Sequence, residues 1–442
     1  MSLRMTRSLV GRSLVLTSAA AIAIATLTPD SRNPGPFTPL CVVCGDLGGV
    51  DVVLNVLLFL PLGLGLVLAG ARPLKAIGGM FAASLTIELL QFLVIPGRDP
   101  TIVDVIMNSI GGAFGFAIGS RLDSLLRPRP PVGAKLLLAW SGALLALQCV
   151  VAYSLVPALT RSSYYGQIDR ELGRSVSAFP GEVLEPTVDS VRIPDSELPD
   201  DRVRELLLRR QGAVIQATVI PNGCPTETGG IVRIADANAR EILVLAQNDA
   251  DLLFGVRTGA EVLRLRPVRY RLHHVFGPES ICALLGDTIL LQARYTRTAV
   301  LLRAAARGRV DEDTIAPSVS RGWRLFLPVQ TYVDSGAKEA ALTTIWLFIL
   351  MFPAGYWAVF ATRGVEPENA RANATAAVFV LAALTIAFVL VPEVFGLPHA
   401  CAWEWLVAIG GAGAGAAAAC RSVTTKWGRS ATRNSGRVNN PN

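Results

Sequence analysis

Residues 51–63 read DVVLNVLLFLPLG, residues 84–92 read SLTIELLQF and residues 101–112 read TIVDVIMNSIGG. All three stretches are apolar, and each carries polar residues at intervals of three or four positions. An ionisable group inside hydrocarbon costs roughly 2.5–3.5 kcal/mol on insertion scales. Several such groups in consecutive apolar segments therefore predict a shared polar site inside a bundle of membrane helices.

The spacing of the polar residues places them on one face of each helix. They are Asp51 and Asn55 in the first stretch, Ser84, Glu88 and Gln91 in the second, and Asp104 and Asn108 in the third. Arg98 lies in the short turn between the second and third stretches, and we expect it to fold over Glu88 or Asp104 as a bidentate ion pair. Glu88 and Arg98 are the expected central pair of a ligand-binding cluster.

A second interpretation of the same residues is purely structural. Polar side chains in membrane bundles often pair with one another and hold helices together. From the end of the third stretch onward, glycines recur every four residues, at Gly111, Gly115 and Gly119. Such a ladder of small residues allows a helix to pack closely against its neighbour.

The composition indicates a membrane protein with some soluble mass. The chain has 442 residues, of which 51% are hydrophobic and 17% charged, against about 25% charged in soluble proteins. Runs long enough to span a bilayer, which takes about 20 residues, occur near residues 8–28, 51–70, 74–95, 101–119, 136–157, 341–361, 373–391 and 401–420. The first run is either a retained helix or a cleaved signal peptide.

Basic residues predict the orientation of these spans. They cluster before the first span, between the second and third, between the fourth and fifth, and after the eighth. With eight spans these positions share one side, so both termini are expected in the cytoplasm and residues 158–340 outside it. The polar cluster would then lie within roughly 15 Å of the outer face.

The expected fold is therefore a multi-pass α-helical membrane protein with an inserted antiparallel β-sandwich of jelly-roll type. Residues 1–157 form five helices, residues 158–340 the sandwich with an irregular lead-in, residues 341–420 three further helices, and residues 421–442 a disordered basic tail. Within the insert, short strand-like runs such as AVIQATVI (213–220) and WRLFLPV (323–329) alternate with turn signals. The segment PDDRVRELLLRRQG (199–212) predicts a short helix.

Cysteine and histidine usage gives no sign of a metal or a cofactor. Cys41 and Cys44 form a lone CxxC pair without further ligands nearby. Cys224 and Cys282 are free to form a disulfide if their domain lies outside the cytoplasm. Basic residues gather at the ends of apolar segments, which argues against a nucleic-acid surface.

The pattern over roughly residues 30–120 resembles the VanZ-like family of bacterial membrane proteins. The resemblance rests on Asp51, the NVLLFLPLG run, Ser84, Glu88 with Gln91, Arg98, and Asp104 with Asn108 and the glycines after it. It implies location in the bacterial cell (inner) membrane and an effect on tolerance to teicoplanin-type glycopeptides. The run GGIVRIADANAREILVLAQNDADLLFGVRTG (229–259) looks like a concanavalin A-like or laminin-G-like sandwich, which implies glycan or protein recognition by analogy.

Three functions compete. The first is a noncatalytic envelope accessory protein that binds a lipid headgroup, a lipid-linked cell-wall component or a glycan at the outer face. The second is an intramembrane enzyme in which Glu88 or Asp104 acts as a general base and Arg98 holds a phosphate or carboxylate. The third is a transporter, which ranks last because the inner halves of the helices carry few polar residues. We expect the first.

Overall fold

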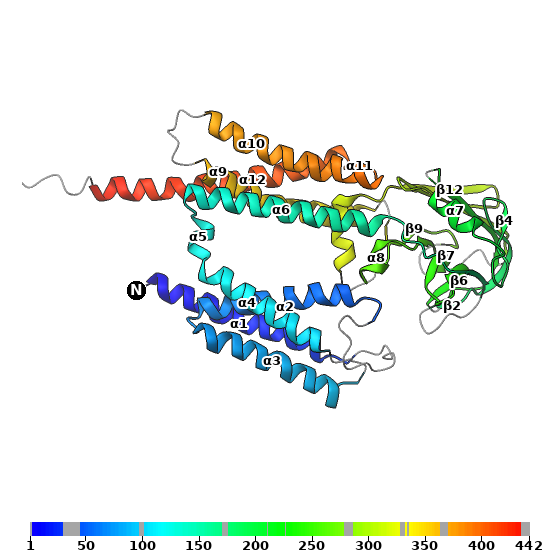
Figure 1. The fold of residues 1–442 in the computed structure, drawn as a ribbon, viewed down its shortest axis with the longest axis horizontal. Coiled ribbons are helices and arrows are strands. Elements are labelled where there is room, and N and C mark those ends of the chain that lie inside the picture. The colour runs from blue at the N-terminus through cyan, green and yellow to red at the C-terminus, as the bar shows by residue number, and fades with distance from the viewer. Residues whose placement is uncertain are drawn as a thin grey trace, which may run out of the picture.

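The structure is a computed structural model that describes residues 2–29, 45–96, 101–169, 176–209, 211–225, 227–277, 286–327, 332–333, 336–362 and 370–434. Its helices form two groups that run side by side, and a β domain lies at one end of both (Figure 1). The N-terminal end of the chain and the end of the last helix lie at the opposite end (Figure 1).

The first group holds four apolar helices. They are α1 (Ser2–Leu27), α2 (Gly48–Leu68), α3 (Pro73–Leu93) and α4 (Ile102–Ser120). All four are long and apolar enough to cross a membrane. Pro73 stands at the start of α3, where the missing N–H costs nothing. Thr101 caps α4, because its side chain accepts a hydrogen bond from the Asp104 backbone N–H.

The second group follows the short helix α5 (Leu122–Leu126). It contains α6 (Pro130–Leu155), α9 (Ala337–Ala361), the continuous run of α10 (Ala370–Thr385), η2 (Ile386–Leu390) and α11 (Val391–Phe395), and α12 (Ala402–Asn434). Seven helices among the described residues are candidate membrane spans, and the multi-pass prediction is confirmed. The eighth predicted span, 401–420, lies in α12. This helix is not among the seven candidates, so its crossing of the membrane stays a prediction. This helix continues to Asn434, through part of the tail that was expected to be disordered.

Glycines set the distance between α2 and α4. A Cβ placed on Gly111 would lie 2.2 Å from the carbonyl oxygen of Val56, and one on Gly115 would lie 1.9 Å from that of Leu60. A Cβ on Gly119 would instead meet the side chains of Leu64 and Val67, at 3.0 and 3.1 Å. The two backbones therefore touch along the expected ladder. Since the contacts advance together along both chains, α2 and α4 run in the same direction.

Glycines also allow close backbone contact between α9 and α12 in the second helix group. A Cβ on Gly355 would lie 1.8 Å from the Ala412 carbonyl oxygen, and one on Gly415 would lie 2.0 Å from that of Phe352. The indole N–H of Trp140 in α6 donates to the Leu350 carbonyl of α9 at 2.8 Å. Small residues and one aromatic donor thus bind α6, α9 and α12 into a second bundle.

The β domain is built from two facing sheets. One has the order β1-β6-β7-β8-β9, with β2 beside β6, and the other has the order β12-β11-β10-β5-β3-β4. Neighbouring strands are antiparallel except β2 and β6. The strands are β1 (Tyr164–Ile168), β2 (Val176–Ala178), β3 (Gly181–Val188), β4 (Val191–Arg192), β5 (Ala213–Pro221), β6 (Thr228–Asp236), β7 (Glu241–Asn248), β8 (Asp251–Val256), β9 (Tyr270–Leu272), β10 (Ile289–Tyr295), β11 (Val300–Ala306) and β12 (Arg309–Ile315).

Alternation along the strands builds the core between the sheets. In β5 buried and half-buried residues alternate over its whole length, which is the period of a strand with one face inward. Ile215, Ala217 and Val219 of β5 face the interior with Leu291 of β10. The β-sandwich prediction is therefore confirmed, whereas the jelly-roll topology stays a prediction.

Two local expectations in this domain were wrong. The lead-in before residue 210, expected to be irregular, contributes β1 to β4 beside the expected short helix α7 (Arg202–Leu208). The run WRLFLPV, expected as a strand, instead lies largely in the 3-10 helix η1 (Val319–Phe326). In η1 the side chain of Trp323 donates to Thr343 of α9 at 3.1 Å, a tertiary contact that overrides strand propensity.

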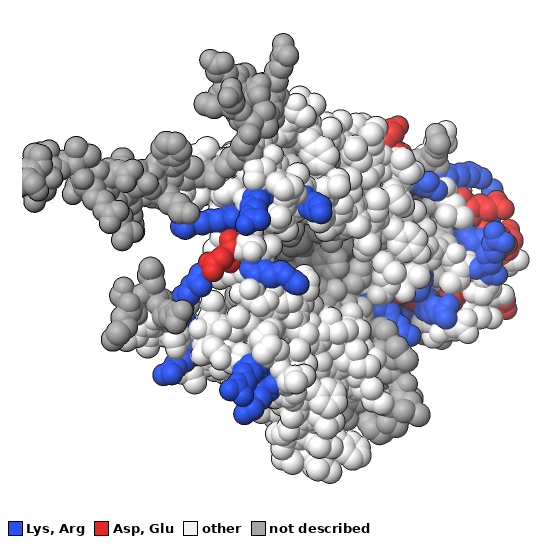
Figure 2. Space-filling model, turned by 60° about the vertical axis from the view of Figure 1, so that its left-hand side comes forward, with Lys and Arg blue, Asp and Glu red and all other residues white. Residues whose placement is uncertain are grey.

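The distribution of charge fits a membrane-spanning body. Figure 2 shows basic residues at the helix ends opposite the sandwich, charges of both signs over the sandwich, and an uncharged band between them. In that band the surface is hollowed between the two helix groups (Figure 2). Cys224 is disulfide-bonded, whereas Cys41, Cys44 and Cys282 lie outside the described residues.

Candidate functional site

The predicted polar residues of α2 and α4 meet. The Asn55 side-chain amide donates to Asp104 Oδ1 at 2.6 Å. The approach of the two helices at Gly111, next to Val56, makes this short bond possible. Asp104 lies in the first turn of α4, where the positive end of the helix dipole favours a carboxylate.

The polar residues of α3 reach α4 at two levels. The Asn108 side-chain amide donates to Ser84 Oγ at 2.9 Å, and both residues are fully enclosed. One turn nearer the sandwich, Glu88 Oε2 accepts from the Thr101 backbone N–H at 2.9 Å. Thr101 therefore contacts both acidic residues, since its hydroxyl also accepts from the Asp104 backbone N–H at 3.0 Å. We call Asn55, Ser84, Glu88, Asp104 and Asn108 the polar cluster.

The other described residues of the prediction make different contacts, and Asp51 lies close enough to Asp104 for the two charges to repel. Gln91 turns toward α1 and donates to the Thr26 carbonyl at 2.8 Å, which joins α3 to α1. Asp51 lies in the first turn of α2 and is exposed. Arg98, predicted to pair with Glu88, lies outside the described residues. Of the seven predicted polar residues that the structure describes, five thus meet in this cluster.

Acceptors outnumber donors in the polar cluster. Asn108 Oδ1 is buried and has no hydrogen-bond partner, while the Asn108 residue as a whole is 1% exposed. Among the described residues Glu88 accepts one hydrogen bond, from Thr101, and the Asp104 carboxylate is bonded by the side chains of Asn55 and Thr101. An ionised carboxylate offers about four lone-pair sites. Counted over the described residues, the cluster therefore has unused capacity for donors such as hydroxyl or ammonium groups.

The cluster lies near the sandwich end of the helices. Asn55 and Asn108 follow the first residues of α2 and α4 by two turns, and Glu88 precedes the last residue of α3 by little more than one. At about 1.5 Å per residue, these three lie within about 11 Å of the helix ends. Over the described residues, no group of three or more His, Cys, Asp or Glu side chains lies close enough to hold a metal ion.

Sequence reasoning missed an ion-pair network where the sandwich meets the second helix group. Arg321 of η1 donates to Glu404 of α12 at 3.1 Å and to Glu339 of α9 at 2.8 Å. Arg324 also pairs with Glu339. Glu404 is 0% exposed, although it lies near the start of the apolar run predicted as a span at 401–420. The one signal in the sequence is the pair of arginines in SRGWR (320–324), upstream of the span predicted at 341–361.

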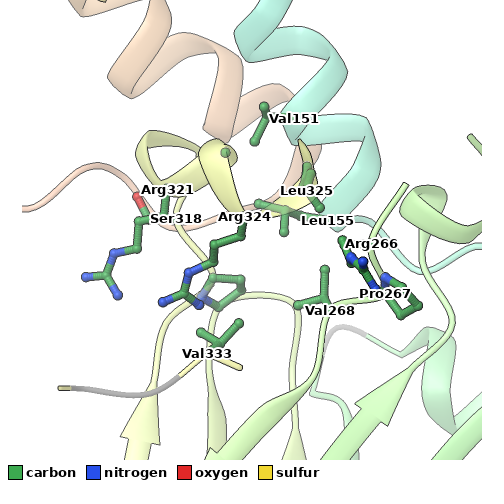
Figure 3. A pocket seen from close by; sticks show the side chains of 12 residues that line it. Val151, Leu155, Arg266, Pro267, Val268, Ser318, Arg321, Arg324, Leu325 and Val333 are labelled. Atoms are coloured by element: carbon green, nitrogen blue, oxygen red, sulfur yellow. The ribbon is translucent and has the colours of Figure 1, made fainter. Parts of the chain in front are cut away.

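A small cavity lies beside this network. Figure 3 shows its lining, which comes from the end of α6, from η1 and from the segment before β9. The volume is about 30 Å³, which is about one water molecule's share of liquid volume. This cavity is therefore too small for an organic ligand, and the network around it connects domains.

Comparison with known proteins identifies the first helix group. Residues 11–123 match the family model described as VanZ/LLP1. The match includes most of α1, all of α2 to α4 and every residue of the polar cluster, so the chain carries a VanZ-like membrane domain. No curated protein and no solved structure matches the chain. The match ends before the β-sandwich, whose likeness to concanavalin A-like or laminin-G-like domains stays a prediction.

Proposed function

We propose that this VanZ-like membrane protein is an accessory protein of the bacterial cell envelope. Its polar cluster binds the hydroxyl- or ammonium-bearing headgroup of a membrane lipid or of a lipid-linked cell-wall component. The observation that carries this proposal is the excess of acceptors, namely the unpartnered Asn108 Oδ1 and those lone pairs of Glu88 and Asp104 that accept no hydrogen bond within the described part of the chain. Buried acceptors without donors are costly, at about 1–3 kcal/mol each, so a donor from a ligand is favourable there.

The position of the cluster supports a lipid as the source of that ligand. The acceptors lie in apolar helices but close to the ends that carry the sandwich. A headgroup entering from the bilayer surface needs to move only a short way along α4 to reach them, while its chains stay in hydrocarbon. We assign this surface to the outer leaflet, because the basic residues gather at the opposite helix ends (Figure 2).

A binding measurement with matched variants tests the proposal. The full-length protein is placed in nanodiscs of phosphatidylcholine, and phosphatidylethanolamine, whose headgroup carries an ammonium group, is titrated while retained lipid is counted by native mass spectrometry. We expect Glu88→Gln and Asp104→Asn to weaken retention by about tenfold, because each loses a charge-assisted hydrogen bond. Asp123→Asn is the control, since Asp123 is an exposed carboxylate at the far end of the first helix group, paired with Arg7.

Equal retention by all variants would make the polar cluster a structural network. The cellular arm is glycopeptide susceptibility of a deletion strain complemented with wild type, Glu88→Gln or Asp123→Asn at matched membrane levels. Rescue by Asp123→Asn but not by Glu88→Gln is the expected result. Consumption of the added lipid by wild type, absent in Glu88→Gln, would replace the binding role with an intramembrane enzyme.

A further inference from the structure

A large cavity lies on the outer face of the first sheet, at the junction with the membrane helices. Its volume is about 1150 Å³, which is at the upper end of ligand pockets, typically about 300–1,000 Å³. The floor is formed by β6, β7 and β8. Because side chains alternate along β8, Leu253 and Arg257 point into the cavity while Phe254 and Val256 belong to the core.

The floor of this cavity combines apolar surface with one aromatic ring. Val244, Ala246 and Leu253 form a separate small apolar cluster, and Tyr332 packs against it. The guanidinium of Arg271 lies over the Tyr332 ring at 5.0 Å. This arrangement offers a flat apolar surface of the kind on which the face of a sugar ring or a glycerol backbone packs.

Arginines dominate the charged walls. The five arginines in the lining are Arg233, Arg240, Arg257, Arg264 and Arg269, and the three carboxylates are Asp46, Glu241 and Glu261. Glu241 is already paired with Arg269 and, at 3.5 Å, with Arg233. Glu261 lies 3.7 Å from Arg269. The described lining therefore carries an excess of positive charge, which favours an anionic ligand. We call this site the arginine-lined cavity.

Three of the arginines have guanidinium groups left for a ligand. Arg257 is half-buried and lines the cavity, and its guanidinium forms no ion pair or hydrogen bond within the described part of the chain. Arg240 and Arg264 are exposed at the rim and form no ion pair within the described part of the chain. A guanidinium presents its N–H groups in a planar fork that matches the oxygens of a phosphate.

Backbone contacts tie the cavity to the ends of membrane helices. Gly49 N in α2 donates to the Arg264 carbonyl at 3.0 Å, and Ala158 N, just after α6, donates to the Arg257 carbonyl at 3.0 Å. Asp46 and the residues after α6 also line the cavity. The short helix α8 (Gly259–Val262), which supplies part of the wall, lies between the helices and the sandwich in Figure 1. The cavity is therefore at the height where the phosphates of lipid headgroups lie.

We propose that the arginine-lined cavity binds the phosphate-bearing headgroup of a membrane lipid or a lipid-linked glycan. The phosphate lies on Arg257, Arg240 and Arg264, and the polyol or sugar lies over Val244, Leu253 and Tyr332. This site is in the sandwich and uses donors, whereas the polar cluster is in the VanZ-like domain and uses acceptors. The inference therefore stands independently of the function proposed above.

The test uses the full-length protein and two probes. Inorganic pyrophosphate is titrated into protein in detergent, and phosphatidylglycerol is compared with phosphatidylcholine in nanodiscs. We expect binding to both probes, and about tenfold weaker binding in Arg257→Gln, which loses one charge-assisted contact. The double variant Arg240→Gln/Arg264→Gln, with both changes at exposed positions, keeps the test valid if Arg257→Gln fails to fold. Arg303→Gln on β11 of the opposite sheet removes one exposed charge as a control.

Each outcome decides the proposal. Binding of phosphatidylglycerol that depends on Arg257 supports a lipid source, and Arg257-dependent binding of pyrophosphate alone supports a soluble phosphate at the same site. Equal weakening in Arg303→Gln would show attraction to net charge only, and absence of binding to both probes would likewise overturn the proposal. Glu88→Gln should leave these affinities unchanged, which separates this site from the polar cluster.

Discussion

Replacing Gly111 with alanine tests whether helix contact builds the polar cluster. The added Cβ would lie 2.2 Å from the Val56 carbonyl oxygen, whereas ordinary contact begins at 3.4 Å. The obstacle is backbone, which cannot rotate aside as a side chain can. The helices α2 and α4 must therefore separate locally by about 1.2 Å to accept the methyl group.

This separation has two consequences of predictable size. Overpacking costs about 1–3 kcal/mol, and we expect the upper part of that range because Gly63 and Gly115 also lie against backbone oxygens in this interface. The bond between Asn55 and Asp104, now 2.6 Å, would lengthen beyond the roughly 3.5 Å at which a hydrogen bond is lost. Gly111→Ala should thus lower both thermal stability and headgroup retention.

Gly79→Ala is the matched control. Gly79 lies on α3, and a Cβ added there meets nothing within 4 Å. Alanine is favoured over glycine in a helix by about 1 kcal/mol, so this variant should be as stable as wild type or slightly more stable. The assay is circular-dichroism melting in detergent together with lipid retention in nanodiscs. Equal behaviour of Gly111→Ala and Gly79→Ala would refute the packing argument.

Two further predictions concern the sandwich and its attachment. Glu404→Gln should lower the free energy of unfolding by about 3 kcal/mol, because breaking a buried ion pair typically costs about 3–5 kcal/mol and Arg321 still pairs with Glu339 at 2.8 Å. We expect faster proteolysis between the sandwich and the second helix group. Unchanged proteolysis would contradict this prediction. Burial raises the pKa of Tyr295 above its ordinary value of about 10, so the folded state resists ionisation. The contribution of Tyr295 to the free energy of unfolding is fully present below pH 10 and decreases above it. Tyr295→Phe should therefore make the fall of stability with pH above 10 shallower by about 1.4 kcal/mol per pH unit. Tyrosinate absorbance and unfolding curves measure this fall, and an unchanged slope would refute the prediction.

The membrane helices and most of the polar cluster were predictable because their signals are local. Apolar runs of the right length mark the spans, and intervals of three or four residues align Ser84 with Glu88 and Asp104 with Asn108 on their helices. The glycine spacing likewise marked the face of α4 that touches α2. In each case residues within one helix turn decide the structure. The pairing of Gln91 with Thr26 was not predictable in this way, because it depends on how α1 lies beside α3.

The strands of the lead-in and the network at Glu404 depend on partners far away in the sequence. Strand β3 is irregular in its burial pattern and exists because β5, about 30 residues later, pairs with it through a bulge. Glu404 lies 83 residues from Arg321, and the local sequence around either residue does not predict that the two form an ion pair. A carboxylate at the end of an apolar helix, considered alone, predicts a group that faces the membrane interface. Burial of Glu404 is favourable only because η1 places a guanidinium group beside it. This tertiary contact offsets the cost of burying the charge, and the spacing of residues along one helix cannot predict it.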